Sequence, residues 1–187
     1  MKLPIYCYGH PVLRNISTDV PADYPDLQQL IADMFETMAF SEGVGLAAPQ
    51  IGKNIRLVVI DATPVAEDFP ECAGFRHALI NPVVEVLDGE EVSRAEGCLS
   101  LPGISDDVKR IEHIRLSWLD ENFKPHEQEF SGFISRIIQH ECDHLDGHLY
   151  IDHTSPIRRQ LNKAKLTNIL TGKVRVPYPA RFAPKKK

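Results

Sequence analysis

The pentapeptide HECDH places His140 and His144 four residues apart. In a helix this spacing is about one turn, so both imidazoles can reach a single metal ion from one face, with Glu141 beside them as a base. Phe133 and Ile137 fall on the same side of the expected helix, which turns the histidines toward the core. The alternative is a pair of core histidines that are satisfied by hydrogen bonds without a metal.

A catalytic ion of this type needs three protein ligands and one open position. A thermolysin-like glutamate ligand is excluded, because the sequence has no Glu after Glu141. The metzincin pattern HExxHxxGxxH continues to Gly147 and then has Tyr150 in place of the third histidine. Cys98 in EGCLSLP is the natural upstream candidate, since a thiolate is a strong ligand. Cys142 is weaker because it lies on another face of the helix, and a buried, inert Cys98 is the alternative.

Three segments together resemble the signature motifs of the peptide deformylase family, in the order that the family has them. They are GVGLAAPQ (43–50), EGCLSLP (96–102) and QHECDHLDG (139–147), and the opening LPIYCYGHPVLR is similar to the usual start of that family. Three spaced motifs are far more specific than HExxH alone. The resemblance implies a metal-dependent hydrolase that removes the formyl group from the N-terminal formyl-methionine of newly made polypeptides and releases formate.

The resemblance also implies the metal ligands, which are Cys98, His140 and His144 with water in the fourth position. Family members use Fe²⁺ natively, and Zn²⁺, Ni²⁺ or Co²⁺ can occupy the site. By the same resemblance Glu141 takes the proton of the water and delivers it to the leaving amine.

Negative charge that develops on the formyl oxygen is expected, by the resemblance, to be stabilised by the Gln50 side chain, the Leu99 backbone N–H and the metal. Substrate backbone approaches Gly45, which has no Cβ, and pairs with its loop as an added strand. Val44 and Ile137 are expected, with His140, to line the pocket for the methionine side chain. As a hypothesis, Glu96 pairs with Arg110 and fixes the cysteine loop.

The elements that must hold these residues follow from hydrophobic periodicity. Apolar residues at helical spacing predict helices over 26–40 and 156–170, and Ser131 and Gly147 are the expected N-cap and C-terminal stop of a helix over 132–146. Glycines close the first helix and predict a loop before the next strand.

A run rich in β-branched residues predicts a strand at 55–60. Further strands are expected at 78–87, 114–119 and 126–130, with turn residues at 88–89 and 120–122. Residues 62–77 lack periodicity and are expected to form a mobile surface excursion. From these elements and the family resemblance, the expected fold class is α+β, with mostly antiparallel sheets packed around a central HExxH helix and with an N-terminal and a C-terminal helix.

Composition is typical of a globular protein, with 187 residues, 43% hydrophobic positions and a net charge of −5. We expect a single domain over 1–172 and a basic, extended or disordered tail over 173–187. All 26 acidic residues precede Ser155, whereas 10 of the 21 Lys and Arg follow it, and this basic end could contact a ribosome. The alternative to a ribosome contact is that these charges form a solvent-exposed helix face and a disordered tail.

The absence of an apolar leader, of a transmembrane run and of a CxxC pair predicts a cytoplasmic protein with no membrane or DNA partner. Its expected partners are formyl-methionyl nascent peptides. Two rivals to the deformylase interpretation are an HExxH endopeptidase and a non-catalytic metal-binding or ribosome-binding protein. The missing downstream ligand disfavours the first, and the presence of Glu141 and Gln50 disfavours the second.

Overall fold

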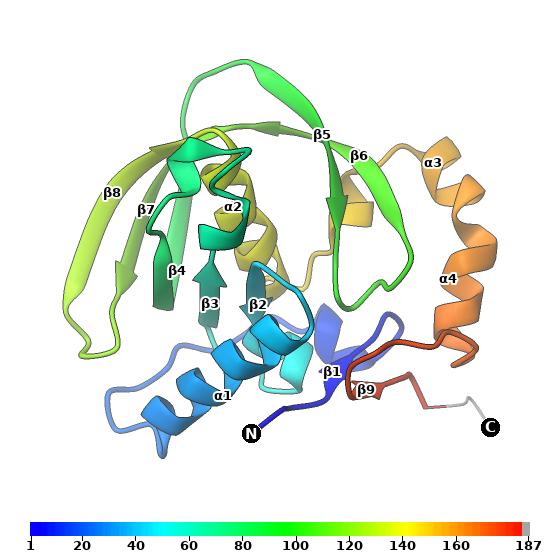
Figure 1. Ribbon diagram of the computed structural model, residues 1–187, viewed down its shortest axis with the longest axis horizontal. Coiled ribbons are helices and arrows are strands. Elements are labelled where there is room, and N and C mark those ends of the chain that lie inside the picture. Colours follow the sequence, from blue (N-terminus) through cyan, green and yellow to red (C-terminus); the bar gives the residue numbers. More distant parts are fainter. Residues whose placement is uncertain (185–187) are drawn as a thin grey trace.

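A five-stranded antiparallel sheet forms the centre of the fold, in the order β2-β3-β4-β7-β8 (Figure 1). The computed structural model describes residues 1–184. The strands are β2 (Gly45–Ala47), β3 (Leu57–Asp61), β4 (Arg76–Val86), β7 (His113–Leu119) and β8 (Pro125–Ser131). All four neighbouring pairs are antiparallel. The expected α+β class is confirmed.

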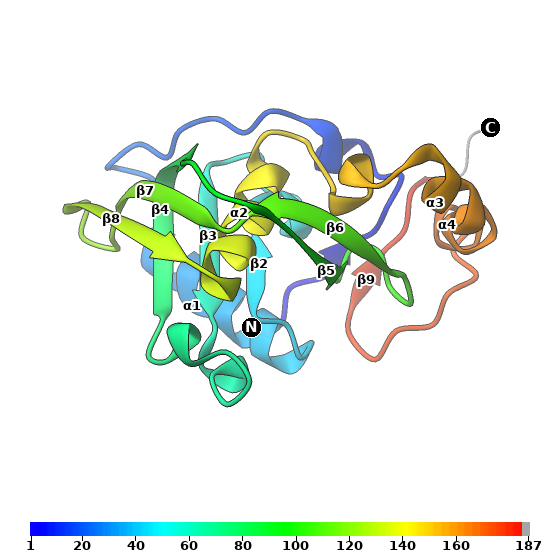
Figure 2. The ribbon, with the colours of Figure 1, turned by 90° about the horizontal axis from the view of Figure 1, so that it is seen from above.

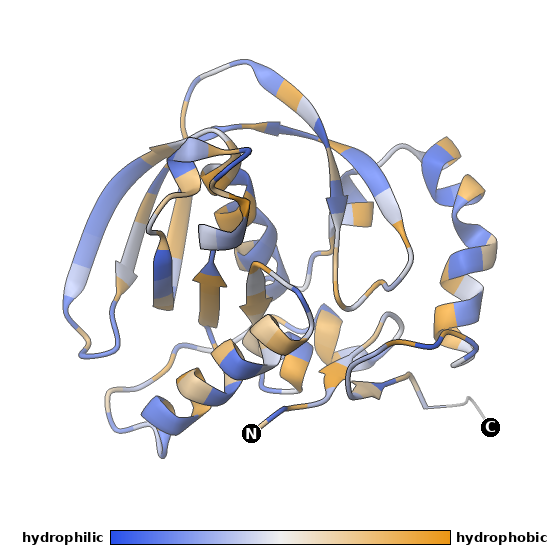
Figure 3. Cartoon of the chain, in the orientation of Figure 1, coloured by the Kyte–Doolittle hydropathy of each residue, from blue (hydrophilic) through white to orange (hydrophobic). Residues whose placement is uncertain are grey.

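Both faces of this sheet are covered by a helix. On β3, Val58 and Ile60 pack in the cluster that contains α2 (Phe133–Leu145), and Leu57 and Val59 pack in the cluster that contains α1 (Leu27–Phe40). Successive side chains of a strand point to opposite faces, so an unbroken apolar run fits a strand that is buried on both sides. Figure 3 shows the resulting hydrophobic colour of β2 and β3.

A separate hairpin, β5 (Glu91–Gly97) and β6 (Ser105–Ile111), was not expected from the sequence. It runs from the side of β4, β7 and β8 across α2 toward the C-terminal helices (Figure 2). Buried and exposed residues alternate along its strands, but the sequence shows no matching hydrophobic pattern. Several of the buried positions carry charged side chains, namely Glu96, Asp106 and Arg110. The hairpin delivers the cysteine segment to the central helix.

Helix α2 begins one residue later than expected, with Gly132 rather than Ser131 at the N-cap position. The first helical amide is capped from a distance, since the Phe133 N–H donates to Glu71 Oε1 at 2.8 Å. Gly147 follows the helix with a φ of +75°, as expected for a C-terminal stop.

The stretch 62–77 is attached to the core. It contains the 3-10 helices Thr63–Val65 and Pro70–Cys72, and the side chains of Ala62, Cys72 and Phe75 are buried against α2 and the sheet. Another short 3-10 helix, Ala48–Ile51, directly follows β2, so the glycine segment that was expected to be a loop contains regular structure.

The expected C-terminal helix is divided at Asn162 into α3 (Pro156–Leu161) and α4 (Lys163–Leu170). Beyond it, β9 (Ala180–Arg181) pairs in parallel with β1 (Ile5–Tyr6). The remaining 3-10 helices are Pro11–Arg14 and Tyr150–His153. The domain boundary at 172 stays a prediction, and residues 185–187 of the expected tail lie outside the described residues. Within residues 1–184, no helix is both long and apolar enough to cross a membrane.

Replacing Glu71 by Ala should destabilise the fold by about 0.5–1 kcal/mol, because α2 loses both its cap and a negative charge at its N-terminus. Thermal unfolding measures this loss as a melting temperature lower by about 2 °C. The matched control is Glu67→Ala, since Glu67 is an exposed residue of the same stretch. Equal melting temperatures for the two variants would show that Glu71 does not cap the helix.

Candidate metal centre

Three ligand side chains meet between α2 and the end of β5. His140 and His144 lie one turn apart on α2, and their ring nitrogens and the Cys98 sulfur all lie within 4.8 Å of one another. The Cys98 Sγ is 3.4 Å from His144 Nε2. The structure therefore brings together the three residues that the sequence predicted as ligands. Cys142 is buried elsewhere on the helix and takes no part.

The loop that carries Cys98 is held by backbone and side-chain bonds. It turns directly after β5, with the Leu101 N–H donating to the Cys98 carbonyl at 2.9 Å and the Tyr8 N–H donating to the Ser100 carbonyl at 2.8 Å. The Gln50 amide donates to Ser100 Oγ at 3.1 Å and lies 3.4 Å from the Cys98 sulfur. These bonds fix the sulfur before any ligand binds.

The charges around the cysteine favour a thiolate. Burial alone would raise the pKa of the Cys98 thiol, but His144 and His140 beside it lower that pKa to about 5. The Glu96 carboxylate lies 2.8 Å from His140 Nδ1, which leaves the other ring nitrogen free to bind an ion. One thiolate and two imidazoles are a donor set that suits a divalent metal ion.

A buried polar atom beside the ligands also points to a bound group. The Oε2 atom of Glu141 is buried and has no hydrogen-bond partner within residues 1–184. An unpartnered carboxylate oxygen is costly to bury. Its place beside three metal ligands fits a water molecule or ion held at the same centre.

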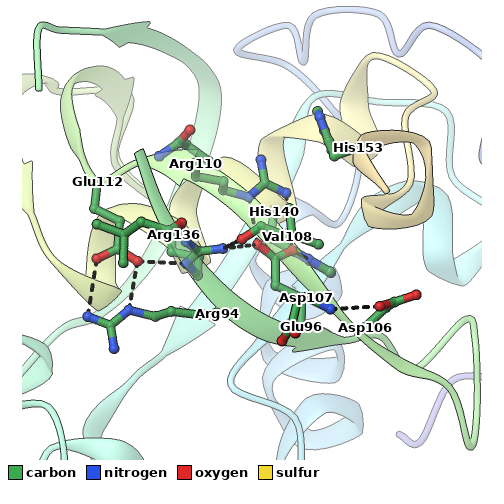
Figure 4. Close-up of polar contacts among 12 residues, drawn as sticks. Arg94, Glu96, Asp106, Asp107, Val108, Arg110, Glu112, Arg136, His140 and His153 are labelled. Atoms are coloured by element: carbon green, nitrogen blue, oxygen red, sulfur yellow. Dashed lines mark hydrogen bonds and ion pairs between the residues drawn. The ribbon is translucent and has the colours of Figure 1, made fainter. Parts of the chain in front are cut away.

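Glu96 is the hub of a buried charge network behind the ligands (Figure 4). Its carboxylate accepts from Arg110 at 2.6 and 3.1 Å and from Arg136 at 2.8 Å, in addition to its contact with His140. Arg110 continues the network to Asp143 on α2 at 3.0 Å. The hypothesis that Glu96 pairs with Arg110 is confirmed.

Arg136 ties the hairpin to α2, a role that sequence reasoning missed. Its side chain is 1% exposed, and it donates to the backbone carbonyls of Val92 on β5 at 2.6 Å and Val108 on β6 at 2.9 Å. It also pairs with Glu112 at 2.7 Å. Its position four residues before His140 was an available signal, because that spacing places both side chains on one face of the helix.

The side-chain carbonyl of Gln50 holds this residue beside the metal ligands. The Ala47 N–H donates to Gln50 Oε1 at 2.9 Å, and the residue is 1% exposed. This bond fixes which end of the amide faces Cys98, so the NH₂ group points at the Cys98 sulfur and the Ser100 hydroxyl.

A pocket of about 580 Å³ opens over the metal ligands. Val44, Gly45 and Ile137 line it, as do Phe133 and Gln50. The absence of a Cβ at Gly45 has a use that the sequence did not reveal: an added Cβ would lie 2.6 Å from both Cγ and Cδ of Glu141. Gly45 thus makes room for the buried carboxylate, and its predicted contact with substrate stays a prediction.

Replacing Glu96 by Gln should weaken metal binding about 10- to 100-fold, the range typical for a lost partner of a metal-bound histidine. The amide has one acceptor oxygen for three donors, so His140 is no longer held. Competition for Zn²⁺ against a chromophoric chelator measures the affinity.

The matched control is Glu91→Gln, an exposed glutamate on the same strand. Unchanged zinc affinity in Glu96→Gln would show that the network serves the fold and leaves the centre unaffected.

Comparison with known proteins agrees with this geometry. A family profile described as polypeptide deformylase matches residues 2–160. A peptide deformylase of Cytophaga hutchinsonii is 45% identical over 186 residues, and one of Flavobacterium psychrophilum is 43% identical over 194, each alignment covering 100% of both chains. The crystal structure of a peptide deformylase from Legionella pneumophila is similar with a TM-score of 0.80 and 38% identity, covering 95% of this chain and 100% of that one. The chain therefore belongs to the polypeptide deformylase family, the hydrolases that remove the N-formyl group from new polypeptides.

Proposed function

We propose that this protein hydrolyses formyl-methionyl peptides with Glu141 as the proton carrier at the Cys98, His140 and His144 centre. The observation that carries the proposal is the buried Glu141 carboxylate, whose Oε2 has no hydrogen-bond partner within residues 1–184 and which lines the same pocket as the ligands Cys98 and His140. A purely structural metal site needs no such carboxylate, since four protein ligands would fill the coordination of its ion.

Bound at these ligands, a divalent ion supplies Lewis acidity that acidifies water and polarises the formyl oxygen. The donor set accepts several divalent ions, and we propose Fe²⁺ as the native one, with Zn²⁺, Ni²⁺ and Co²⁺ as substitutes.

The environment of Glu141 suits a group that takes a proton and returns it. Burial raises the pKa of this carboxyl to about 7, against the opposing effect of His140 and His144. A pKa near the working pH is the best compromise between accepting and donating a proton. Glu141 thus accepts the proton of the attacking water on its free Oε2 and delivers it to the departing amine.

We assign two donors to the charge that forms on the formyl oxygen. The Gln50 NH₂ group lies beside the Cys98 sulfur, and the Leu99 N–H belongs to the residue that follows this ligand. Donors aimed at a developing oxyanion stabilise the transition state more than the ground state. We assign them the role of an oxyanion hole.

Strand β2 offers a place for the peptide backbone. It is an edge strand of the sheet, and its first residue, Gly45, lines the pocket. An edge strand has unpaired backbone groups on its outer side, so an extended peptide can pair with it. Val44 and Ile137 then provide apolar surface for the methionine side chain.

A contact with the ribosome through α3 and α4 is a further part of the proposal. Arg158 is paired with Asp106 at 2.7 Å, whereas Arg159, Lys163 and Lys165 make no ion pair within residues 1–184 and are exposed. Such cations bind RNA phosphates, and formylated nascent chains are made in the cytoplasm, where we place the protein. Cosedimentation with ribosomes should be lost at high salt and in an Arg159→Glu/Lys163→Glu variant; absence of binding at low salt would contradict the contact.

Replacing Glu141 by Ala should lower formate release from formyl-Met-Ala peptides at least about 100-fold, the lower end for loss of a general acid–base group. Anaerobically purified wild type and variant are compared, and the metal content of both is determined. The metal should be retained, because Glu141 is not a ligand.

Gly45→Ala tests the same assignment without changing Glu141, because the added methyl displaces the Glu141 carboxylate. The decrease in kcat caused by Gly45→Ala should not add to the decrease caused by Glu141→Ala when both changes are combined in one variant. Cleavage of internal peptide bonds by the wild type would favour an endopeptidase instead. No formate from metal-loaded wild type would refute the proposed function.

A further inference from the structure

The segment after α4 returns to the metal centre and forms part of its pocket. In Figure 1 this red segment passes below the lower end of the β5–β6 hairpin and reaches β1. Residues 175–178 line the same pocket as Glu141 and Gln50. They lie outside the part of the chain that matches the family profile, which ends at residue 160.

One hydrogen bond joins this segment to the loop that carries a metal ligand. The Tyr178 hydroxyl donates to the backbone carbonyl of Leu99 at 2.8 Å. The same ring packs at the edge of the core cluster that contains α1, where the Leu99 side chain also packs. Burial raises the pKa of Tyr178 above its ordinary value, so the hydroxyl keeps its proton and remains a donor.

The backbone around Tyr178 is fixed by the start of the chain. The Ile5 N–H donates to the Pro179 carbonyl and the Cys7 N–H donates to the Arg181 carbonyl, both at 2.8 Å. These bonds come directly after Tyr178, so its ring extends from an anchored strand and not from a free tail. Because its backbone is anchored, the Tyr178 side chain can hold the loop that carries Leu99.

We infer that Tyr178 is a positioning residue of the active site, which holds the Leu99 carbonyl and thereby orients the Leu99 N–H in the oxyanion hole. The two groups belong to neighbouring peptide planes that meet at the Leu99 Cα, so holding the carbonyl restrains that Cα and limits how far the N–H can move. The metal ligand Cys98 is separately held by Gln50 and by the turn to Leu101. Loss of the tyrosine hydroxyl should therefore affect the oxyanion donor and spare the metal.

The test is Tyr178→Phe in the full-length, metal-loaded protein, a change that removes the hydroxyl and keeps the ring. We expect kcat for formyl-Met-Ala to fall about threefold to tenfold with little change in KM and in metal content. A displacement of 1 Å at a reacting centre costs about 100-fold, and one lost hydrogen bond moves the loop by less. Backbone amides of residues 98–104 should exchange their hydrogens faster, which is a readout independent of activity.

The matched control is Tyr6→Phe. Tyr6 lies on β1 against Arg181, and its hydroxyl makes no hydrogen bond within residues 1–184, so we expect neither effect. Wild-type kcat and exchange in Tyr178→Phe would overturn the inference, as would a loss of activity that only follows a loss of metal. The kcat measurement rests on the proposed function, and absence of formate from the wild type would refute that function while the exchange result still decides the role of Tyr178.

Discussion

The hydrogen bonds to the Glu96 carboxylate are the interactions on which the arrangement of the site depends. This carboxylate lies on β5 and accepts from Arg110 on β6, from Arg136 on α2 and from His140 on α2. Buried charges are tolerated only when they are paired and hydrogen-bonded, and removal of one partner typically costs about 3–5 kcal/mol. The three elements can therefore meet in few ways other than the one that satisfies this carboxylate.

That constraint also sets the position of the metal ligands. Glu96 lies two residues before Cys98, which directly follows β5, so fixing Glu96 restricts where the thiolate can lie. Residues four apart on a helix share a face, so Arg136 and His140 bring His144 to the same side. One carboxylate thus sets the position of β5, which leads into the thiolate loop, against the helix that carries both imidazoles.

The fold could be predicted where apolar residues occupy the buried positions. This holds for α1, α2 and the strands β3, β4 and β7, whose hydrophobic patterns identified them with small errors at their ends. Strand β8 has one buried residue, Phe130, and the turn residues before it supported its prediction. Prediction fails for the β5–β6 hairpin, where buried alternating positions are charged and hydrophobicity gives no period. It fails also for the start of α2, because Glu71 caps the helix from 62 residues away and leaves no local pattern.

The residues of the site also fall into two groups, those that the sequence predicts and those that it does not. The three ligands lie within short motifs, so spacing and family resemblance were sufficient to predict them, and the role of Glu141 stays a prediction from the same motif. Several groups that support the site come from distant parts of the chain: Arg136 is 40 residues from Glu96, and Tyr178 is 79 residues from Leu99. Chemistry of this kind needs a few residue types at fixed spacing, whereas many side chains can supply a supporting hydrogen bond. A supporting residue such as Tyr178 therefore has no fixed spacing in the sequence, and it is identified once folding places it beside the residue that it holds.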